Sequence, residues 1–375
     1  MEFVRRFIPG SNKKNDVPWE TQETLGHGQR VLYTSLSGID LRPTIIDEFE
    51  KNGYLITPSF VFPGGRFPGR NCDLGLGIDQ RLANSAEKND YIAAAAGLKQ
   101  PAKIEFPQIL DFEQPIVAKD PSSDRGESVF LLPNKESLAK FLAYDSNFFG
   151  NPWYRSNDLN LASQIAIRTH NWDWEGFYQL HPSYPWRFEE YIETPSDFYT
   201  SFRILADGYG NIHYGTLLRS PVKKGGKRIS SPDSFEPLKN PNSRFYLNSP
   251  SIVSNAAQGG IGIQLNGEAV LDPINRQVLI DHGINPDNPR IPESMEQKAS
   301  KVGKIMKTMY PFTGVDFVDN LSLEDLFLEA NNGPTLFAEG LGVSKEEIDK
   351  NKGNEYEQEY LARVLIRRIA KNAPQ

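Results

Sequence analysis

Two acidic residues and one amide near the end of the chain have the types and the spacing of a metal site. Asp316 lies in one apolar run, Glu329 lies in the next, and Asn331 follows Glu329 by two positions. Because side chains alternate along a β-strand, Glu329 and Asn331 share one face. Carboxylate and carboxamide oxygens suit Mg²⁺, which completes its shell with water and phosphate oxygens. The sequence therefore predicts a magnesium site.

A turn is the alternative interpretation of this stretch. The two acids could simply face solvent beside four consecutive turn formers, Asn331, Asn332, Gly333 and Pro334. However, residues 326 to 328 are apolar and come directly before Glu329, where a buried strand would continue with another apolar residue. We favour the metal site for this reason.

A lysine at the end of another apolar run indicates an anion site. Residues 116–119 and 129–132 predict the two strands of a hairpin, and Lys119 ends the first strand. An unpaired ammonium is costly to bury, and a phosphate would be a suitable partner. The turn offers backbone N–H groups and little side-chain bulk at Ser123 and Gly126, as a phosphate-covering loop requires. An ordinary surface hairpin is the structural alternative.

The composition excludes several classes of protein. The chain has 375 residues, 38% hydrophobic and 24% charged, which suits a compact protein of two or three subdomains. A net charge of -7 argues against a nucleic-acid partner, since nucleic-acid binders concentrate basic residues in a stripe. With Cys72 as its only cysteine and no secretory leader, the chain is expected to be cytoplasmic. No apolar run approaches the roughly 18 residues of a membrane span, so no membrane partner is expected.

The first block of elements is a βαβ unit behind an N-terminal tail. The tail covers residues 1–28 and the unit covers residues 29–83. The pattern predicts, in order, a strand at 30–35, a helix that starts at Pro43 and ends before Gly53, a strand at 54–62 and a loop at 63–79. A helix between two strands is typical of a parallel pair, so the fold class is α/β.

Two further blocks carry the residues with chemistry. The second covers residues 84–186 and includes a helix at 85–98, the hairpin and a helix behind the N-cap Asn134. The third covers residues 187–375. It predicts alternating strands, a helix over 293–309 with Ala299, Val302, Met306 and Met309 on one face, another strand pair, and a C-terminal helix over 356–371.

From about residue 84 to residue 341 the chain resembles members of the ATP-grasp superfamily. The segments that carry the resemblance are, in order, Lys88 in SAEKND, Lys119 with its small-residue loop, the hinge FEEYIETPSDF, the strand SFRILADGYGNIHYGTLLRS, Asn255 and Gly259-Gly260 in SNAAQGG, and Asp316 with LEANNGP. The resemblance implies a βαβ domain followed by two α+β subdomains that sandwich ATP. It is closest to the glutathione-synthetase-like and ribosomal-S6-modification-like branches.

The resemblance also implies roles for the matching residues. Those that would hold the nucleotide are Lys88 and Lys119 at the phosphates, Ser123 to Gly126 in the covering loop, Glu189, Glu190 and Ile192 at adenine, and Asp197 at the ribose. Those that would hold two Mg²⁺ ions, or Mn²⁺, are Asp316, Glu329 and Asn331. Those that would face the transferred phosphate and the acceptor carboxylate are Arg203, Arg219 and Asn255.

The activity implied is that of an ATP-dependent carboxylate–amine ligase. A substrate carboxylate would attack the γ-phosphorus, and an amine would then displace phosphate from the acylphosphate. The partners would be a small-molecule or peptide carboxylate and an amine, and a homodimer is the family expectation. Two alternatives remain: a kinase that stops at phosphoryl transfer to a hydroxyl, and a nucleotide-binding regulator without turnover.

Three segments depart from the family pattern or add to it. The phosphate loop has one glycine, Gly126, and Glu127 adds a negative charge beside it. Residues 146–185 are rich in tryptophan, and we expect a satellite core there, with a platform for an aromatic or peptidic substrate as the alternative. Residues 220–245 combine proline and basic residues, and we expect a lid over an anionic intermediate, with a mobile solvated loop as the alternative.

Overall fold

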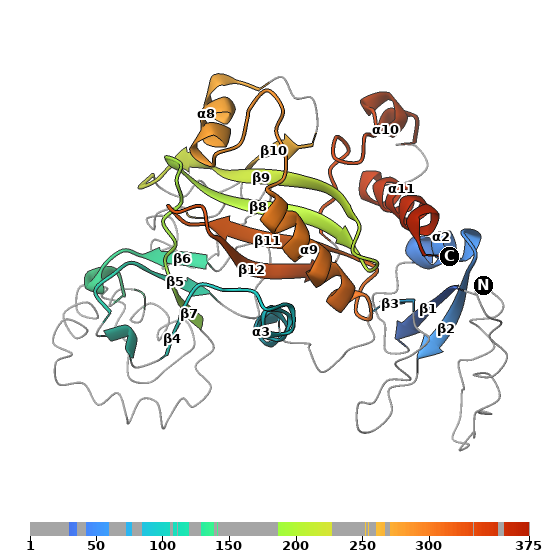
Figure 1. Ribbon diagram of the computed structural model, residues 1–375, viewed down its shortest axis with the longest axis horizontal. Coiled ribbons are helices and arrows are strands. Elements are labelled where there is room, and N and C mark those ends of the chain that lie inside the picture. The colour runs from blue at the N-terminus through green and yellow to red at the C-terminus, as the bar shows by residue number, and fades with distance from the viewer. Residues whose placement is uncertain are drawn as a thin grey trace, which may run out of the picture.

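The computed structural model has mixed α/β architecture, as the sequence predicts (Figure 1). It describes residues 30–35, 43–59, 73–76, 85–105, 108–110, 112–119, 129–138, 141, 187–226, 252, 254, 260–266, 271–332, 334–351 and 356–374. These residues form one parallel and two antiparallel sheets. Within the described part of the chain, no helix has the length and apolar character needed to cross a bilayer.

The N-terminal sheet is the predicted βαβ unit with one added strand. β1 (Arg30–Ser35) pairs in parallel with β2 (Tyr54–Ser59), and α2 (Pro43–Lys51) connects them. β3 (Leu74–Leu76) lies parallel to β1 on its other side, so the loop prediction is wrong for these three residues. The strand is held by distant partners, because Gly75 N donates to Lys307 O at 2.6 Å. A three-residue strand of this kind has no periodic signal of its own.

The four-stranded sheet contains the predicted hairpin and is called the small sheet. β5 (Ile116–Lys119) lies between β6 (Val129–Leu132) and β7 (Arg187–Glu190), and β4 (Lys103–Ile104) pairs with β7. The N-cap prediction is confirmed, because Asn134 Oδ1 accepts Ser137 N at 2.9 Å. The phosphate loop and residues 146–185 lie outside the described residues.

The five-stranded sheet is called the large sheet, and helices cover one of its faces (Figure 1). Its strands in spatial order are β10 (Ile261–Leu265), β9 (Ile212–Lys223), β8 (Phe198–Asp207), β11 (Phe312–Asp319) and β12 (Asp325–Asn332). The covering helices are α3 (Ser85–Ala96), α8 (Pro273–Asp281) and α9 (Glu293–Met306).

The core of this layer agrees with the predicted apolar face of α9. Ala299, Val302 and Met306 are buried against strand residues such as Phe202 and Val315. The helix ends at Met306, three residues before the predicted end, although Met309 is buried as well. Sequence reasoning missed α8, whose Asp272 cap and Pro273 at the first helical position were visible signals.

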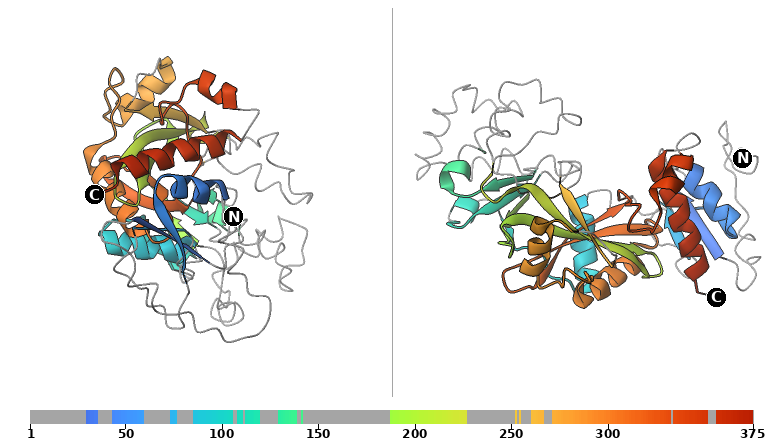
Figure 2. Two further views of the ribbon diagram at one scale, coloured as in Figure 1. Left: turned by 90° about the vertical axis from the view of Figure 1, so that its right-hand side faces the viewer. Right: turned by 90° about the horizontal axis from the view of Figure 1, so that it is seen from above.

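The last helix returns to the N-terminal sheet. α10 (Lys345–Asn351) leads to α11 (Glu357–Asn372), which packs beside α2, as both views of Figure 2 show. Apolar residues of both helices share one core, among them Ile45, Phe49, Leu361, Leu365 and Ile369. At the edge of this core, Arg367 Nε donates to Glu48 Oε1 at 2.7 Å and Arg363 Nε donates to Glu48 Oε2 at 3.1 Å.

We expect Glu48→Gln to destabilise the chain in a pH-dependent way. Burial raises the pKa of Glu48, but its bonds to Arg367 and Arg363 outweigh burial and hold the pKa below 4.5. A lowered pKa contributes stability that is present above pH 4.5 and is lost as the pH falls through the folded-state pKa. At neutral pH the substitution should cost roughly 1–3 kcal/mol of unfolding free energy.

Urea unfolding of both proteins between neutral and acidic pH measures this difference. The exposed Glu50 on the same helix provides the control, Glu50→Gln, which should unfold like the wild type. A cost that persists unchanged at acidic pH would contradict the role of the ionised carboxylate.

Candidate active site

The predicted metal residues lie on neighbouring strands of the large sheet. Asp316 of β11 pairs in register with Glu329 of β12 on one side and with Arg203 of β8 on the other. Residues directly opposite one another in a sheet project from the same face. Asp316, Glu329 and Arg203 therefore share a face, and Gly314 opposite Asn331 continues this alignment.

A β-bulge at Leu328 determines which way Glu329 points. Phe317 pairs with Phe327, whereas the preceding residue Asp316 pairs with Glu329, so Leu328 is an extra residue in β12. Without it, Glu329 would share the face of Phe327, which is buried under the helices. The extra residue explains how an acid can follow three apolar residues and still leave the core.

Hydrogen bonds join these side chains into what we call the carboxylate cluster: Arg203, Asp316, Glu329 and Asn331. Arg203 holds Asp316 with a two-pronged contact, Nε to Oδ1 at 2.8 Å and Nη2 to Oδ2 at 2.6 Å. The Asn331 amide donates to Asp316 Oδ2 at 3.1 Å and to Glu329 Oε1 at 2.9 Å. Arg203 and Asp316 are only 8% and 6% exposed, so this is a buried ion pair with a second carboxylate beside it.

The electrostatics of the cluster favour an additional cation. Burial raises the pKa of Asp316, and so does the neighbouring Glu329 carboxylate; together they outweigh the lowering effect of Arg203 and bring the pKa to about 6. For Arg203, burial lowers the pKa, but the Asp316 carboxylate more than compensates, so the guanidinium stays charged. A cation between the two carboxylates would relieve their repulsion.

The residues of the cluster fit Mg²⁺. Their oxygens are hard ligands, and rotating the Asn331 carboxamide by half a turn would present Oδ1 in place of the amide nitrogen. Among the described residues, no group of three His, Cys, Asp or Glu side chains is placed to hold a metal. Two carboxylates and an amide leave coordination positions for water and phosphate, which is the usual arrangement for Mg²⁺ bound with a nucleotide.

α3 brings Lys88 to this cluster. Lys88 is 8% exposed, and burial lowers its pKa while the negative charge of Glu329 acts in the opposite direction. The next residue, Asn89, accepts the backbone N–H of Ala330 at 3.0 Å through Oδ1. The structure therefore gathers five predicted site residues: Lys88, Arg203, Asp316, Glu329 and Asn331.

Lys119 lies in an ion-pair group on the small sheet. Its Nζ lies 2.5 Å from Glu189 Oε2, and Arg187 Nε lies 2.5 Å from Glu189 Oε1. Burial raises the pKa of Glu189, but Lys119 and Arg187 hold it below its usual value. Glu190 points elsewhere, since its Oε1 accepts Ala102 N at 2.8 Å. The carboxylates of Glu189 and Glu190 are thus both occupied by protein groups, and the strand that carries them is paired on both sides, with β4 and with β5.

Residues 191–197 connect β7 and β8 and belong to the predicted hinge. Ile192 is half-buried, and the exposed Asp197 pairs with Lys223 at 2.7 Å. Lys224 contacts Glu193 and donates to Thr194 O at 2.6 Å. The start of the predicted lid is thus attached to the hinge, while residues 227–245 lie outside the described part.

The polar faces of the two sheets meet beside the hinge. Tyr199 of β8 packs with Val117 of β5 and Leu131 of β6. Alternation places Tyr199 on the face of Arg203, and it places Val117 on the face of Lys119. The face that carries the carboxylate cluster is therefore the one turned toward Lys119.

Arg219 does not join Arg203. It lies three residues after Thr216, which pairs with Arg203, so alternation along β9 puts Arg219 on the opposite, helix-covered face. There its guanidinium carbon lies 4.8 Å from the centroid of the Phe198 ring, and Nε donates to Asn275 Oδ1 of α8 at 2.7 Å. The structure thus separates two residues that the sequence suggested would act together.

Three predicted site residues, Ser123, Gly126 and Asn255, lie outside the described residues. Sequence reasoning also missed Arg187, Asn89 and Asp90, which contact the predicted residues or the strand that carries them. Asn89 and Asp90 follow Lys88 directly, and a charged or amide residue on the partly buried helix was the available signal.

Comparisons with known proteins give matches in structure but not in sequence. No family model and no curated protein matches the sequence. Among solved structures, the RiPP-associated ATP-grasp ligase of Chryseobacterium gregarium, in complex with ADP and a leader and core peptide, is 12% identical with a TM-score of 0.37, and the match covers 92% of this chain and 98% of that one.

Two further matches are a macrocyclase and a ligase. The macrocyclase MdnC of Microcystis aeruginosa, bound to its precursor peptide, is 11% identical, with a TM-score of 0.36 and coverage of 91% and 100%. The VanG D-Ala:D-Ser ligase of Enterococcus faecalis is 10% identical, with a TM-score of 0.36 and coverage of 90% and 98%. ATP-grasp ligases, which the sequence resembles, thus occur among the matching structures. Because identities and TM-scores are low, the functional argument rests on the site's own residues.

We expect Arg203→Met to destabilise the chain strongly. The substitution leaves the buried Asp316 carboxylate without its cation, which should cost roughly 3–5 kcal/mol of unfolding free energy. Adding Asp316→Leu should recover part of this loss, because no buried charge then remains unpaired. Urea unfolding measures both variants against Arg290→Met, which removes an exposed arginine. Equal stability of Arg203→Met and Arg290→Met would show that the pair is not needed for folding.

Proposed function

We propose that the chain is an ATP-dependent carboxylate–amine ligase of the ATP-grasp type. The observation that carries the proposal is the gathering of two carboxylates, Asp316 and Glu329, and the Asn331 amide on one sheet face. Arg203 bonds to Asp316 on this face, and Lys88 of α3 lies near enough to Glu329 to feel its charge. This face is turned toward the sheet that carries Lys119. Hard-oxygen ligands and two lysines, Lys88 on α3 and Lys119 on β5, are the groups that a magnesium-bound triphosphate requires.

The charges of the cluster support joint binding of metal and nucleotide. Lys88 and Arg203 balance Asp316 and Glu329, so the site has no net charge before a ligand enters. Mg²⁺ alone would add two uncompensated positive charges, and a triphosphate alone would lie beside two carboxylates. The two together restore the balance, so we infer that each binds well only with the other.

The proposed reaction proceeds in two displacements. An oxygen of the substrate carboxylate attacks the γ-phosphorus, the bond from this phosphorus to the β-phosphate oxygen breaks, and ADP leaves. The amine nitrogen then attacks the carbonyl carbon of the acylphosphate, phosphate leaves with the electron pair of the broken C–O bond, and the nitrogen loses a proton. When bound, Mg²⁺ supplies charge neutralisation at the phosphate oxygens.

The chain's own residues orient and neutralise the reacting groups. Lys88, from α3, and Lys119, from the small sheet, would bind phosphate oxygens. Arg203 uses Nε and Nη2 on Asp316, which leaves Nη1 for an oxygen of the acceptor or of the transferred phosphate. Arg219 has no role in this scheme, because it lies on the other face of the sheet.

Trapping with hydroxylamine tests the reaction class. With Mg²⁺, ATP and a panel of small carboxylates and peptides, a ligase should release ADP and form a hydroxamate from the activated carboxylate. ADP release that depends on a hydroxyl acceptor, with no hydroxamate, would indicate the kinase alternative. Tight nucleotide binding without ADP release across the panel would indicate the regulator.

We expect ATP to raise the melting temperature only when Mg²⁺ is present, because the triphosphate would otherwise lie beside two carboxylates. A ligand that binds only the folded chain stabilises it by about 2.7 kcal/mol at a hundredfold excess over Kd. Glu329→Gln should abolish this dependence on Mg²⁺ and any turnover, while the protein stays folded. The control is Glu296→Gln, which changes an exposed residue of α9. Normal turnover in Glu329→Gln would refute the metal assignment.

We expect Lys119→Ala to weaken Mg²⁺–ATP binding by about tenfold, because it removes one charge-assisted contact to phosphate. Isothermal titration measures the affinity. Lys135→Ala removes an exposed lysine near the same sheet and should bind like the wild type. If both variants bound equally well, residues 116–132 would be an ordinary hairpin.

A further inference from the structure

Three consecutive residues of α3 contact both antiparallel sheets. Lys88 and Asn89 lie against β12 of the large sheet, and Asp90 contacts β4 and β7 of the small sheet. The rest of the helix is fixed independently, because Ile92 and Ala93 are buried in the core under the large sheet. The first turns of α3 therefore connect the carboxylate cluster to the ion-pair group of Lys119.

Asn89 completes the outer edge of β12. Among the described residues β12 is the last strand of the large sheet, so its outward N–H groups have no strand partner in that part of the chain. Asn89 Oδ1 accepts the N–H of Ala330 at 3.0 Å, and Ala330 lies between Glu329 and Asn331. A buried N–H without an acceptor costs roughly 1–3 kcal/mol. This bond fixes the backbone that carries two of the proposed metal ligands.

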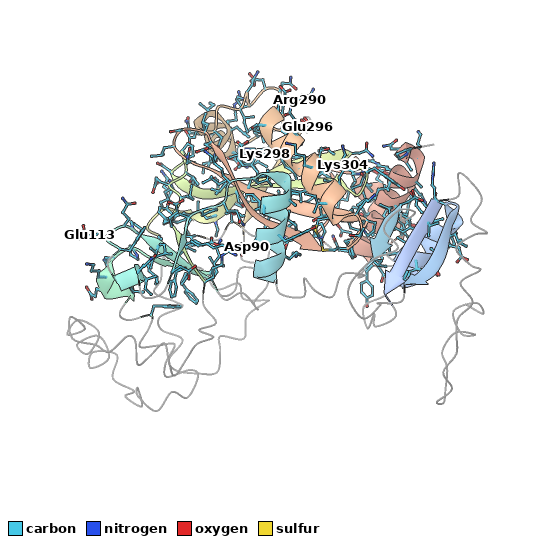
Figure 3. The ribbon with its side chains drawn as sticks, turned by 60° about the horizontal axis from the view of Figure 1, so that its bottom comes forward. Asp90, Glu113, Arg290, Glu296, Lys298 and Lys304 are labelled. Carbon is cyan, nitrogen blue, oxygen red and sulfur yellow. The ribbon has the colours of Figure 1, made fainter. Side chains whose placement is uncertain are left out.

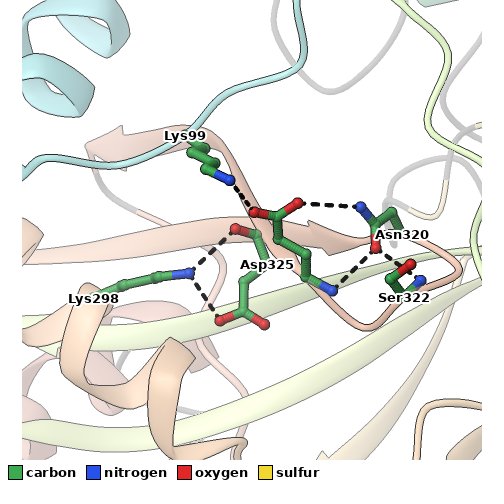
Figure 4. Close-up of polar contacts among 6 residues, drawn as sticks. Lys99, Lys298, Asn320, Ser322 and Asp325 are labelled. Atoms are coloured by element: carbon green, nitrogen blue, oxygen red, sulfur yellow. Dashed lines mark hydrogen bonds and ion pairs between the residues drawn. The ribbon is translucent and has the colours of Figure 1, made fainter.

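The segment that follows α3 holds the same edge beyond the bulge. Lys99 O accepts Phe327 N at 2.8 Å, and the Lys99 ammonium pairs with Glu324 (Figure 4). In the same view Lys298 donates to Asp325 Oδ2 at 3.0 Å, which anchors the start of β12 to α9. β12 is thus held on both sides of Leu328, and the bulge cannot slip without breaking these contacts.

Asp90 holds the small sheet. Its Oδ1 lies 3.2 Å from Arg187 Nη1, and its Oδ2 pairs with Lys103. Figure 3 shows Asp90 on the flank of α3 nearest the small sheet. Arg187 in turn contacts Glu189, which holds Lys119. A continuous series of charged contacts therefore runs from α3 to Lys119.

These contacts would allow Lys119 to leave Glu189 and bind a ligand. If Lys119 turned from Glu189 to a phosphate, the 4%-exposed Glu189 carboxylate would lose one of its two cations. Arg187 would remain to balance it, and Asp90 keeps Arg187 in place. A buried carboxylate without a partner is strongly unfavourable, so this second cation makes the exchange possible.

We propose that Asn89 and Asp90 are positioning residues that hold the carboxylate cluster and Lys119 in the one arrangement where both reach the same magnesium-bound triphosphate. The inference rests on the proposed function. The new element is that the affinity for nucleotide depends on Asn89 and Asp90 of α3, although neither side chain needs to touch the ligand.

The first experiment is isothermal titration of the full chain with Mg²⁺–ATP. Asp90→Asn should raise Kd about tenfold, the loss of one charge-assisted contact, and Asp90→Glu should restore most of the affinity. The control Glu113→Gln removes the same charge from an exposed position of the small-sheet segment and should bind like the wild type. Melting temperatures without ligand should stay close together, because α3 remains held by its core residues.

The second experiment does not depend on nucleotide. In hydrogen exchange without ligand, the Ala330 amide should exchange at least about tenfold faster in Asn89→Ala than in the wild type, since its acceptor is lost. Glu113→Gln should leave this rate unchanged.

The outcomes separate the two proposals. A wild-type chain that binds no Mg²⁺–ATP would overturn the proposed function and, with it, this inference. Wild-type binding with an unchanged Kd in Asp90→Asn, a failure of Asp90→Glu to restore affinity, or an unchanged Ala330 exchange rate would overturn the positioning role alone.

Discussion

The buried contact between Arg203 and Asp316 is the constraint on which the site depends. Two charges inside a sheet are tolerated only when they satisfy one another closely, and the two-pronged contact at 2.8 and 2.6 Å does so. This contact requires β8 and β11 to pair in one register, because a shift of one residue would put either side chain on the helix-covered face. Once that register is set, the bulge at Leu328 is needed to bring Glu329 and Asn331 to the face of the Asp316 carboxylate.

The covering helices make this arrangement stable from outside the sheet. α9 packs its apolar face against the strands and leaves the opposite face free for polar residues. α3 and the segment that follows it close the edge of β12 with a side-chain oxygen of Asn89 and the backbone carbonyl of Lys99, in place of another strand. An edge closed in this way cannot recruit a further strand, and it keeps the ligand-bearing backbone from fraying.

The N-terminal sheet is completed from the other end of the chain. α11 packs on α2, and Glu48 bridges two of its arginines. A short parallel sheet buries too little apolar surface to be stable with one helix on it. The contact also restrains the C-terminal segment, whose Phe337 N donates to Tyr214 of β9 at 3.1 Å. Folding of the first sheet and ordering of the last segments are therefore coupled.

Much of the fold could be predicted from local patterns, and the exceptions have physical reasons. The βαβ unit, the hairpin whose first strand ends at Lys119 and the C-terminal helix follow from periodicity and from turn and cap residues. β3 could not be found, because a three-residue strand exists only through its partners. The sequence also could not show which face of the sheet Arg219 lies on. That face depends on how β8 and β9 pair, including the register irregularity near the turn between them.

By itself the sequence determined which chemical groups are present and how they are spaced along each strand or helix. An acid after three apolar residues, a lysine at the end of a strand and an amide two positions from the acid already pointed to magnesium and phosphate. Only the tertiary structure decided which of these groups share a face, that Lys88 lies beside Glu329, and that Asn89 and Asp90 join the two sheets. Strand register and the docking of a helix on a distant edge are set by contacts between segments far apart in the chain, and a local pattern contains no information about them.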